Sequence, residues 1–292
     1  MQTATTLDML RNALSALRRD GGTIGLVTTM GALHEGHLTL VREARKACDH
    51  VVASIFVNPA QFGPNEDLDR YPRQLSEDAA MLAAEGVALL WAPDVEVMYP
   101  SGFATTVSVP AVSARYCGAS RPGHFDGVAT VVCKLFNQIQ PDMAFFGEKD
   151  YQQLTVIRSM ARDLDLLRPA AGCIIGVPTV REDDGLAMSS RNRYLSAEDR
   201  AHAAALPQAM QRAVAAIESG ADVAETLAML ADDLVAHGFT SVDYAALADA
   251  RTLAPLARLG PGPARLLVAA RIGGARLIDN LPVQSKNSQP LG

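Results

Sequence analysis

The sequence predicts an α/β protein, with a doubly wound parallel sheet in its N-terminal part and a smaller α+β domain after it. Strand-like and helix-like segments alternate through roughly the first 175 residues, which is the pattern of parallel strands joined by helical crossovers. Residues 51–57 are almost continuously apolar, as in a strand that is covered on both faces of its sheet. Two alanine-rich helical segments then mark a change of character after Pro178.

The first part of the chain follows a Rossmann-like order of elements. We predict strands at 23–29, 51–57, 87–91 and 143–146, and helices from about 38, at 75–85, at 126–140 and at 150–165. Asp126 is expected to cap the third of these helices, and Pro141 to end it. Because ligands bind at the carboxyl ends of such strands, the turns after Val27, Val57 and Phe146 are the places to look for chemistry.

The second part predicts a smaller α+β domain. We expect helices at 196–219 and 223–237, strands at 242–247 and 266–270, and a Gly-Pro loop at 260–263. The predicted domains are therefore residues 1–176 and 177–285, with a hinge near 176. A polar tail, 286–292, is expected to be disordered.

Composition limits the classes of function. The chain has 292 residues and a net charge of −6, from 26 basic and 32 acidic residues, which argues against a broad nucleic-acid surface but allows a small anionic substrate. The longest apolar runs fall short of the roughly 20 residues of a membrane span, and Asp8 and Arg11 interrupt any secretory signal. The four cysteines show no metal-type spacing, so we expect a cytoplasmic, thiol-reduced protein with no membrane partner.

A turn with two histidines follows the first strand. It consists of Met30-Gly31-Ala32-Leu33-His34-Glu35-Gly36-His37. Backbone N–H groups and the helix dipole at such a junction favour an anion such as a triphosphate, and two histidines three residues apart there can face one ligand. Isolated histidines are more often plain surface residues, and the spacing is not that of a zinc-binding His-Glu-x-x-His motif. The strand before and the helix after favour nucleotide binding.

Three further segments carry polar chemistry, although each alone also fits an ordinary loop or helix cap. Asn58 and Gln61 follow the second strand, and their amides suit a hydroxylated substrate. Arg121 and His124 lie beside Pro122-Gly123, where they are placed to hold a carboxylate. Gly147-Glu148-Lys149-Asp150 lies between a strand and a helix and suits phosphate or ribose contacts, with Gln153 one turn further on.

A late segment, Met188-Ser189-Ser190-Arg191, combines two hydroxyls with an arginine. Such groups can neutralise the charge that develops on a triphosphate leaving group. The segment resembles the mobile Lys-Met-Ser-Lys-Ser loop of nucleotidyl-transfer enzymes, although the lysines are absent and Arg191 supplies the cation. Ser-Ser-Arg runs are common, so this segment decides nothing alone.

Taken together and in this order, the segments resemble the pantothenate synthetase family, ATP-dependent ligases of the His-x-Gly-His nucleotidyltransferase superfamily that join pantoate to β-alanine. The resemblance runs from Thr23 to Asn280. It departs at Thr28, where the family usually has proline; threonine retains a backbone N–H and predicts a less rigid turn. The shared motifs are Met-Gly-Ala-Leu-His-Glu-Gly-His, Phe-Val-Asn-Pro-x-Gln-Phe, Arg-Pro-Gly-His-Phe, Phe-Gly-Glu-Lys-Asp, Ser-Ser-Arg-Asn and Ala-Arg-Leu-Ile-Asp-Asn.

This resemblance implies roles for particular residues. Gln61 and Gln153 would hold the pantoate and β-alanine substrates, with Asn58 and Tyr71 lining the same pocket. His37 would be the general acid, and His34, Lys149, Ser189 and Arg191 would complete the catalytic set on the phosphates. The ATP site would consist of Met30, Gly31, Ala32, Leu33, His34, Glu35, Gly36, His37, Gly147, Glu148, Lys149, Asp150, Val180, Met188, Ser189, Ser190 and Arg191. Mg²⁺ would be carried by ATP, with no metal site on the protein.

The resemblance also implies the reaction. Pantoate would attack ATP to give enzyme-bound pantoyl adenylate and pyrophosphate, with His37, Lys149 and Arg191 as cations that offset the developing charge. β-Alanine would then release AMP and form pantothenate, on the route to coenzyme A. The smaller domain would close over the site, and the family is usually a homodimer.

Three alternatives remain open from the residues. An adenylyl transferase with another acceptor fits the same scaffold, although Asn58, Gln61 and Gln153 suit a small hydroxy acid better than a nucleobase. A silent nucleotide-binding module would have lost its phosphate contacts, which are all present. A nicotinamide-dependent dehydrogenase would need Gly-x-Gly-x-x-Gly in the first turn, which is missing.

Overall fold

The computed structural model describes residues 1–19, 21–64, 66 and 68–285, arranged in two compact units. The first unit contains Met1–Glu148 and Gln153–Pro178, and the second contains Lys149–Gln152 and Thr179–Gly292. The predicted hinge at residue 176 falls inside a strand of the first unit. The assignment of 149–152 to the second unit was not predicted, and the predicted tail, 286–292, lies outside the described residues.

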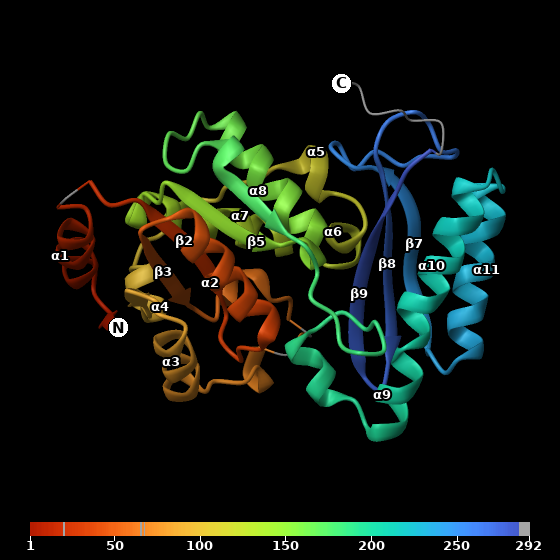
Figure 1. Ribbon diagram of the computed structural model, residues 1–292, viewed down its shortest axis with the longest axis horizontal. Coiled ribbons are helices and arrows are strands. Elements are labelled where there is room, and N and C mark those ends of the chain that lie inside the picture. The colour runs from red at the N-terminus through yellow and green to blue at the C-terminus, as the bar shows by residue number, and fades with distance from the viewer. Residues whose placement is uncertain (20, 65, 67, 286–292) are drawn as a thin grey trace. The chain divides into compact units, whose positions relative to one another are not determined.

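The first unit is built on a parallel sheet of six strands in the order β1-β4-β3-β2-β5-β6 (Figure 1). The chain runs from β2 to β4 in one direction and then to β5 and β6 in the other, so the order reverses between β2 and β5. The doubly wound prediction is confirmed. The strands are β1 (Gln2–Ala4), β2 (Ile24–Thr29), β3 (His50–Ile55), β4 (Leu89–Trp91), β5 (Met143–Gly147) and β6 (Ile174–Val177).

Helices connect these strands, and α2 lies across β2 and β3 in Figure 1. The helix α2 packs with α3, and α1 packs with α7, as expected where right-handed crossovers run in opposite directions across a sheet. The main helices are α1 (Leu7–Leu17), α2 (Glu35–Ala47), α3 (Leu75–Ala84), α7 (His124–Ile139) and α8 (Tyr151–Asp163). Shorter helices are α4 (Val95–Met98), α5 (Pro110–Ser113) and α6 (Cys117–Ser120), with 3-10 turns η1 (Pro59–Gln61), η2 (Leu68–Arg70), η3 (Glu148–Asp150) and η4 (Ala171–Cys173).

Two expectations for the first unit need correction. The helix α7 begins at His124 and not at Asp126, because Gly123 takes a left-handed conformation (φ 80°) at the N-cap. Asp126 does not cap the helix: it lies in the first turn and accepts a hydrogen bond from the Ser108 hydroxyl at 2.7 Å. We did not predict β1, α1 or β6, which add the two outer strands of the sheet.

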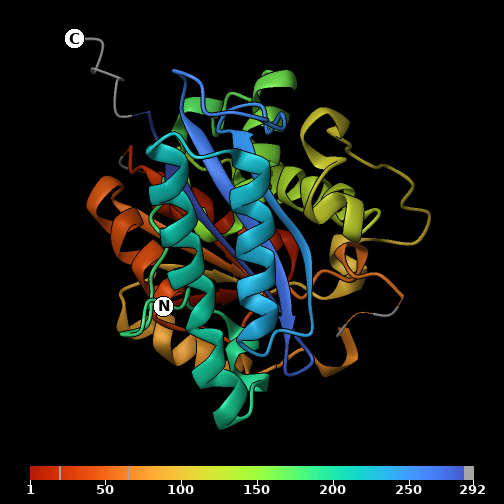
Figure 2. The ribbon, with the colours of Figure 1, turned by 90° about the vertical axis from the view of Figure 1, so that its right-hand side faces the viewer.

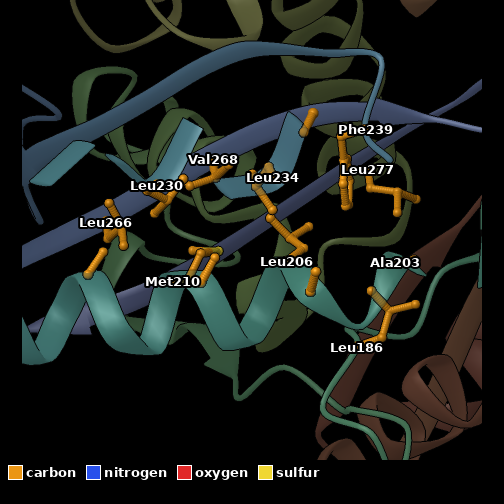
Figure 3. Close-up of a cluster of buried hydrophobic side chains, with 14 of the residues drawn as sticks. Leu186, Ala203, Leu206, Met210, Leu230, Leu234, Phe239, Leu266, Val268 and Leu277 are labelled. Carbon is orange, nitrogen blue, oxygen red and sulfur yellow. The ribbon is translucent and has the colours of Figure 1, made fainter. Parts of the chain in front are cut away.

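The second unit is a three-stranded antiparallel sheet covered by two long helices, as Figure 2 shows. Its strands are β7 (Ser241–Asp249), β8 (Ala264–Ile272) and β9 (Ala275–Val283), and its helices are α9 (Ala197–Ala203), α10 (Ala205–Glu218) and α11 (Val223–Ala236), with η5 (Ser190–Tyr194) before them. Leucine and methionine side chains from α10 and α11 meet those of β8 and β9 in one core (Figure 3). Burial of these side chains is the main source of the unit's stability.

Two sequence-based details of this unit were wrong or missed. The predicted helix 196–219 is two helices that meet at Ala204. Pro207 lies in the first turn of α10 and has no N–H to bond the preceding turn, which ends α9. The strand β9 was missed, although Gly273-Gly274, with positive φ at both glycines, is a strong signal for a two-residue hairpin.

Two global observations bear on the expected environment. Within the ranges that the structure describes, no helix has both the length and the apolar character needed to cross a bilayer. Cys48, Cys117, Cys133 and Cys173 are all free thiols.

Candidate active site

Three of the predicted turns follow neighbouring strands of the first unit. They come after β2, β3 and β5, and β2 pairs in parallel with both of the others. Parallel strands place their carboxyl ends at one edge of the sheet, and the strand order reverses between β2 and β5, which is where ligands bind in doubly wound sheets. Thr28, the departure from the family pattern, lies within β2 opposite Ser54, so strand pairing constrains its backbone.

The two histidines cap the N-terminus of α2 reciprocally. Nδ1 of His34 accepts the Gly36 N–H at 3.2 Å, and Nδ1 of His37 accepts the His34 N–H at 3.3 Å. Their ring centroids are 4.1 Å apart. Because Nδ1 is an acceptor in both rings, each ring in its neutral form carries its hydrogen on Nε2. A second proton on Nδ1 of His37 would remove this acceptor from the His34 N–H.

A buried carboxylate supports this turn. Asp78 of α3 is 1% exposed, and its Oδ2 and Oδ1 accept the N–H groups of Ala32 and Leu33, both at 2.9 Å. Gln74 also donates to Oδ1, at 3.2 Å. The turn needs this support because Gly31 and Ala32 both have positive φ, which costs energy for alanine. Sequence reasoning missed Asp78, although a charged residue one turn before buried Leu82 was a usable signal.

The side chains of this segment have different surroundings. Ala32 and Leu33 are buried, and their N–H groups are already bonded to Asp78. The Glu35 carboxylate is paired with Arg42, which also binds Glu85. Within Met30–His37, the predicted contacts to ATP are thus most compatible with the two imidazoles.

Asn58 is tied to the protein on all sides. It is 1% exposed; its Nδ2 donates to Gln61 Oε1 and Gly127 O, both at 3.1 Å. Its Oδ1 accepts from Ala60 N at 3.2 Å and from the Tyr99 hydroxyl at 2.7 Å. These four bonds use the full capacity of an amide. We therefore correct the expectation that Asn58 contacts substrate: it positions its neighbours. Tyr99 was missed by sequence reasoning.

The structure brings Gln61 beside the first residue of the histidine turn. Gln61 is 8% exposed, and its Nε2 lies 2.8 Å from the sulfur of Met30. Tyr71 is also buried, and its ring packs edge-on against Phe62 with centroids 5.9 Å apart. Gln153 lies in the first turn of α8 and is partly buried. Gln61 and Tyr71 are thereby placed in and beside one turn.

Arg121 and His124 already hold a carboxylate of the protein. Arg121 binds both oxygens of Glu66 at 2.6 Å, and His124 contacts Arg121 and the Gln61 carbonyl at 2.9 and 2.8 Å. Burial acts to raise the pKa of Glu66, but the Arg121 hydrogen bonds and charge outweigh it and hold that pKa below its usual value. This network supports the main chain at Gln61.

The segment after β5 divides between the units. Gly147 and Glu148 belong to the first unit, whereas Lys149 and Asp150 belong to the second. The Lys149 carbonyl accepts a hydrogen bond from Asn280 Nδ2 at 2.9 Å, and Asn280 Oδ1 accepts from Arg265 at 2.6 Å. Asn280, quoted above only as part of a motif, therefore positions the predicted phosphate-binding lysine.

The Val180–Arg191 loop is a folded-back hairpin of the second unit. Met188 N donates to Val180 O at 3.0 Å, and Ser189 Oγ accepts the Arg191 N–H at 3.3 Å. Arg181, in its first arm, forms two hydrogen bonds with Asp279, at 2.7 and 2.9 Å. The Asp279 side chain is fully buried. The predicted hydroxyls and arginine thus follow one another on a braced loop.

A second set of contacts joins the loop to Asn192 and Arg200, which follow it in the sequence. Glu182 accepts from Asn192 Nδ2 at 2.8 Å and pairs with Arg200 at 2.7 Å. Asn192 Nδ2 also donates to the Ala187 carbonyl at 3.1 Å. None of these three side chains was singled out from sequence, because their roles depend on contacts within the folded loop.

The fold and the arrangement of the two histidines together indicate a class of enzyme. A doubly wound sheet whose first turn presents two imidazole N–H donors at a helix N-terminus is typical of enzymes that bind a nucleoside triphosphate and act on its phosphates.

Comparison with known proteins gives the particular family. The family described as pantoate-beta-alanine ligase matches residues 2–282. Pantothenate synthetase of Novosphingobium aromaticivorans is 68% identical over 283 residues, which cover 97% of this chain and 99% of that protein. That of Sphingopyxis alaskensis is 62% identical and covers 97% and 100%.

Solved structures agree. The crystal structure of pantothenate synthetase from Thermus thermophilus has a TM-score of 0.88 and 51% identity and covers 97% of this chain and 100% of its own. That of pantoate-beta-alanine ligase from Francisella tularensis, complexed with "beta-gamma ATP" and β-alanine, has a TM-score of 0.80, 34% identity and coverages of 96% and 97%. The chain belongs to the pantoate–β-alanine ligase family, whose members condense pantoate with β-alanine using ATP, and it has this ligase activity.

Proposed function

We propose that the condensation proceeds through an enzyme-bound pantoyl adenylate. A carboxylate oxygen of pantoate attacks the α-phosphorus of ATP; the new P–O bond forms as the bond to pyrophosphate breaks. The β-alanine nitrogen then attacks the acyl carbon, the C–O bond to AMP breaks, and the amine proton passes to a base or to solvent. Holding adenylate and amine together removes much of the entropic cost of the second step.

One observation carries this assignment: the reciprocal capping of His34 and His37 at the carboxyl end of β2. Both rings keep Nδ1 as an acceptor, so we assign their Nε2–H groups as hydrogen-bond donors to the triphosphate, and His37 offsets charge on the departing pyrophosphate through such a bond. Lys149 and Arg191 then supply the positive charge that offsets the leaving pyrophosphate, with Ser189 as a further donor.

The substrate contacts are also proposals. Gln61 and Gln153 hold pantoate, and Tyr71 closes the same pocket. The remaining residues of the three ATP-binding stretches named above complete the nucleotide site. Residues 1–176 act as the binding domain and 177–285 as a lid that excludes water from the adenylate. The braced Val180–Arg191 loop supports this role because it carries the phosphate contacts of the lid.

Mg²⁺ is proposed to enter on the triphosphate of ATP, where it would neutralise phosphate charge. Among the residues that the structure describes, no group of three or more histidine, cysteine or carboxylate side chains is placed to hold a metal ion. The imidazole, lysine and arginine donors suit the phosphate oxygens that such an ion leaves uncoordinated.

A cytoplasmic location and a homodimer complete the proposal. The four free thiols support a reducing compartment. The dimer rests on the family resemblance alone, and sedimentation of the purified chain tests it directly.

The adenylate is tested by isotope exchange between pyrophosphate and ATP without β-alanine. We expect exchange that requires pantoate, and AMP release that β-alanine accelerates. The variant His37→Ala should reduce exchange by about 10²–10³-fold, the usual effect of losing one donor to a developing oxyanion. A matched control is His50→Ala, because His50 begins β3 and so lies at the amino end of the strand, away from the carboxyl ends where the site is proposed.

The outcomes separate the alternatives. If the enzyme makes pantothenate but shows no pantoate-dependent exchange, the stepwise mechanism is wrong. If the exchange rate of His50→Ala is reduced as much as that of His37→Ala, the loss reflects impaired folding, and the assignment of His37 fails.

A further inference from the structure

The polarity of the Asn58 amide is set by the main chain. Ala60 N can only donate, so it must face Asn58 Oδ1, and Gly127 O can only accept, so it must face Nδ2. The orientation of this buried amide therefore has one solution.

Tyr99 is fitted to this arrangement. Its hydroxyl lies 2.7 Å from Asn58 Oδ1, which accepts, so the hydroxyl must donate. Its ring is held between Phe56 and Phe103, with centroids 6.1 and 5.1 Å away. Burial raises the pKa of Tyr99 to about 12, against the opposing effect of the Asn58 bond, so the hydroxyl keeps its proton at any working pH.

The consequence reaches Gln61. Asn58 Nδ2 donates to Gln61 Oε1, so the carbonyl end of Gln61 is used inside the protein. The amide end, Nε2, is left toward Met30, whose sulfur at 2.8 Å is a weak acceptor. An oxygen of a ligand would be a better partner for either of its two hydrogens.

Gly127 makes this relay possible. A Cβ at this position would lie 2.2 Å from the Ala60 carbonyl oxygen and 2.7 Å from Gln61 N. Only glycine lets α7 approach the Asn58–Gln61 turn closely enough for the Gly127 carbonyl to reach Asn58.

We propose that Tyr99 and Asn58 are positioning residues that fix Gln61 with its N–H end toward pantoate, so that this subsite accepts only a hydrogen-bond-accepting oxygen of the substrate. The inference rests on the proposed contact between Gln61 and pantoate. Under this proposal Tyr99 contributes to the affinity for pantoate without contacting pantoate itself.

The main test is Tyr99→Phe, which removes one hydroxyl and keeps the ring. We expect the KM for pantoate to rise about five-fold, the effect of losing one neutral hydrogen bond, with kcat and the KM for ATP within about two-fold of the parent. Tyr116→Phe, which removes another half-buried hydroxyl of the first unit, is the matched control and should change none of them.

A double-mutant cycle shows whether the effect passes through Gln61. In a Gln61→Ala background, Tyr99→Phe should no longer raise the KM for pantoate, because the group it orients is gone. An equal rise in both backgrounds would overturn the relay.

Asn58→Asp tests the polarity itself. An oxygen in place of Nδ2 cannot donate to Gln61 Oε1, so Gln61 must turn its carbonyl end outward. We expect the KM for pantoate to rise about 50-fold, because the Gln61 carbonyl oxygen would then face a pantoate oxygen and neither could donate a hydrogen bond. The affinity for ATP, measured by direct titration, should be unchanged. Unchanged pantoate affinity with ATP still bound would contradict the relay.

Gln61→Ala alone separates this inference from the proposed function. If its KM for pantoate matches the parent, then Gln61 does not contact pantoate, and both proposals fall at that residue. If it rises strongly while Tyr99→Phe and Asn58→Asp have no effect, only the relay is wrong.

Discussion

Two buried aspartates, one in each unit, hold the two loops that carry the proposed phosphate contacts, and they do so differently. Asp78 is 1% exposed and accepts from two main-chain N–H groups and one amide, all of them neutral. Asp279 is 2% exposed; it binds the charged Arg181 through two hydrogen bonds and also accepts the N–H of the next residue, Asn280, at 2.7 Å. A carboxylate held by main-chain dipoles fixes a backbone shape, whereas one paired with arginine fixes a side chain and depends on its partner's charge.

The largest expected effect is on the ion pair of the second unit. Asp279→Ala leaves Arg181 with a partly buried, uncompensated charge and should cost about 3–5 kcal/mol of unfolding free energy. Urea denaturation measures it. The double variant Asp279→Ala, Arg181→Met should recover part of the loss, and no recovery would show that the charge is not what matters.

The next effect concerns the histidine turn. Asp78→Ala leaves the N–H groups of Ala32 and Leu33 without their acceptor and should cost about 2–4 kcal/mol. Asp78→Asn keeps one acceptor oxygen and should lose less. If the aspartate shapes the turn, the folded Asp78→Asn enzyme also has a raised KM for ATP; a normal KM would restrict Asp78 to stability.

Gly127→Ala tests how closely α7 packs against the Asn58–Gln61 turn. The added methyl must displace the Ala60 carbonyl and should cost about 1–3 kcal/mol, as overpacking does. Gly172→Ala adds a methyl into open space of the same unit and serves as control. Equal melting temperatures for the two variants would contradict the close approach of α7.

Glu66 gives a pH-dependent comparison. Because its pKa is lowered in the folded protein, its pairing with Arg121 stabilises fully above the unfolded pKa of about 4.3, and this contribution is lost as pH falls through the folded pKa. Melting temperatures of the parent and Glu66→Gln should thus differ at about pH 7 and converge as the pH falls below the unfolded pKa of about 4.3. A constant difference across this range would exclude the ion pair as its source.

The smallest stability effect carries a functional readout. Glu182→Ala removes partly exposed contacts to Asn192 and Arg200 and should cost about 1 kcal/mol or less. If the Val180–Arg191 loop shields the adenylate, loosening it raises the AMP released per pantothenate formed. An unchanged ratio would refute the shielding role of the loop.

The sequence predicted the sheet class and the turns after β2, β3 and β5, because apolar runs and turn residues are local signals. It could not predict that all four hydrogen bonds of the Asn58 amide are made within the protein, since Tyr99 and Gly127 are distant in sequence. Asp78 escaped notice, and Asp279 was quoted only within a motif, because their partners include main-chain groups or an arginine far along the chain. The helix break before Pro207 and the Gly273-Gly274 hairpin were local signals that were readable and were overlooked.

The chain passes between the two units after Glu148, after Gln152 and after Pro178. The first turn of α8 therefore takes its partners from the end of the sequence: Tyr151 bonds the Ala250 carbonyl and stacks on Arg265. A recombination event that joined residues 1–178 to a foreign C-terminal half would inherit Lys149 without Asn280, the residue that orients it. The segment that carries the proposed phosphate contact of Lys149 is therefore inherited with its Asn280 partner only when both parts of the chain are inherited together.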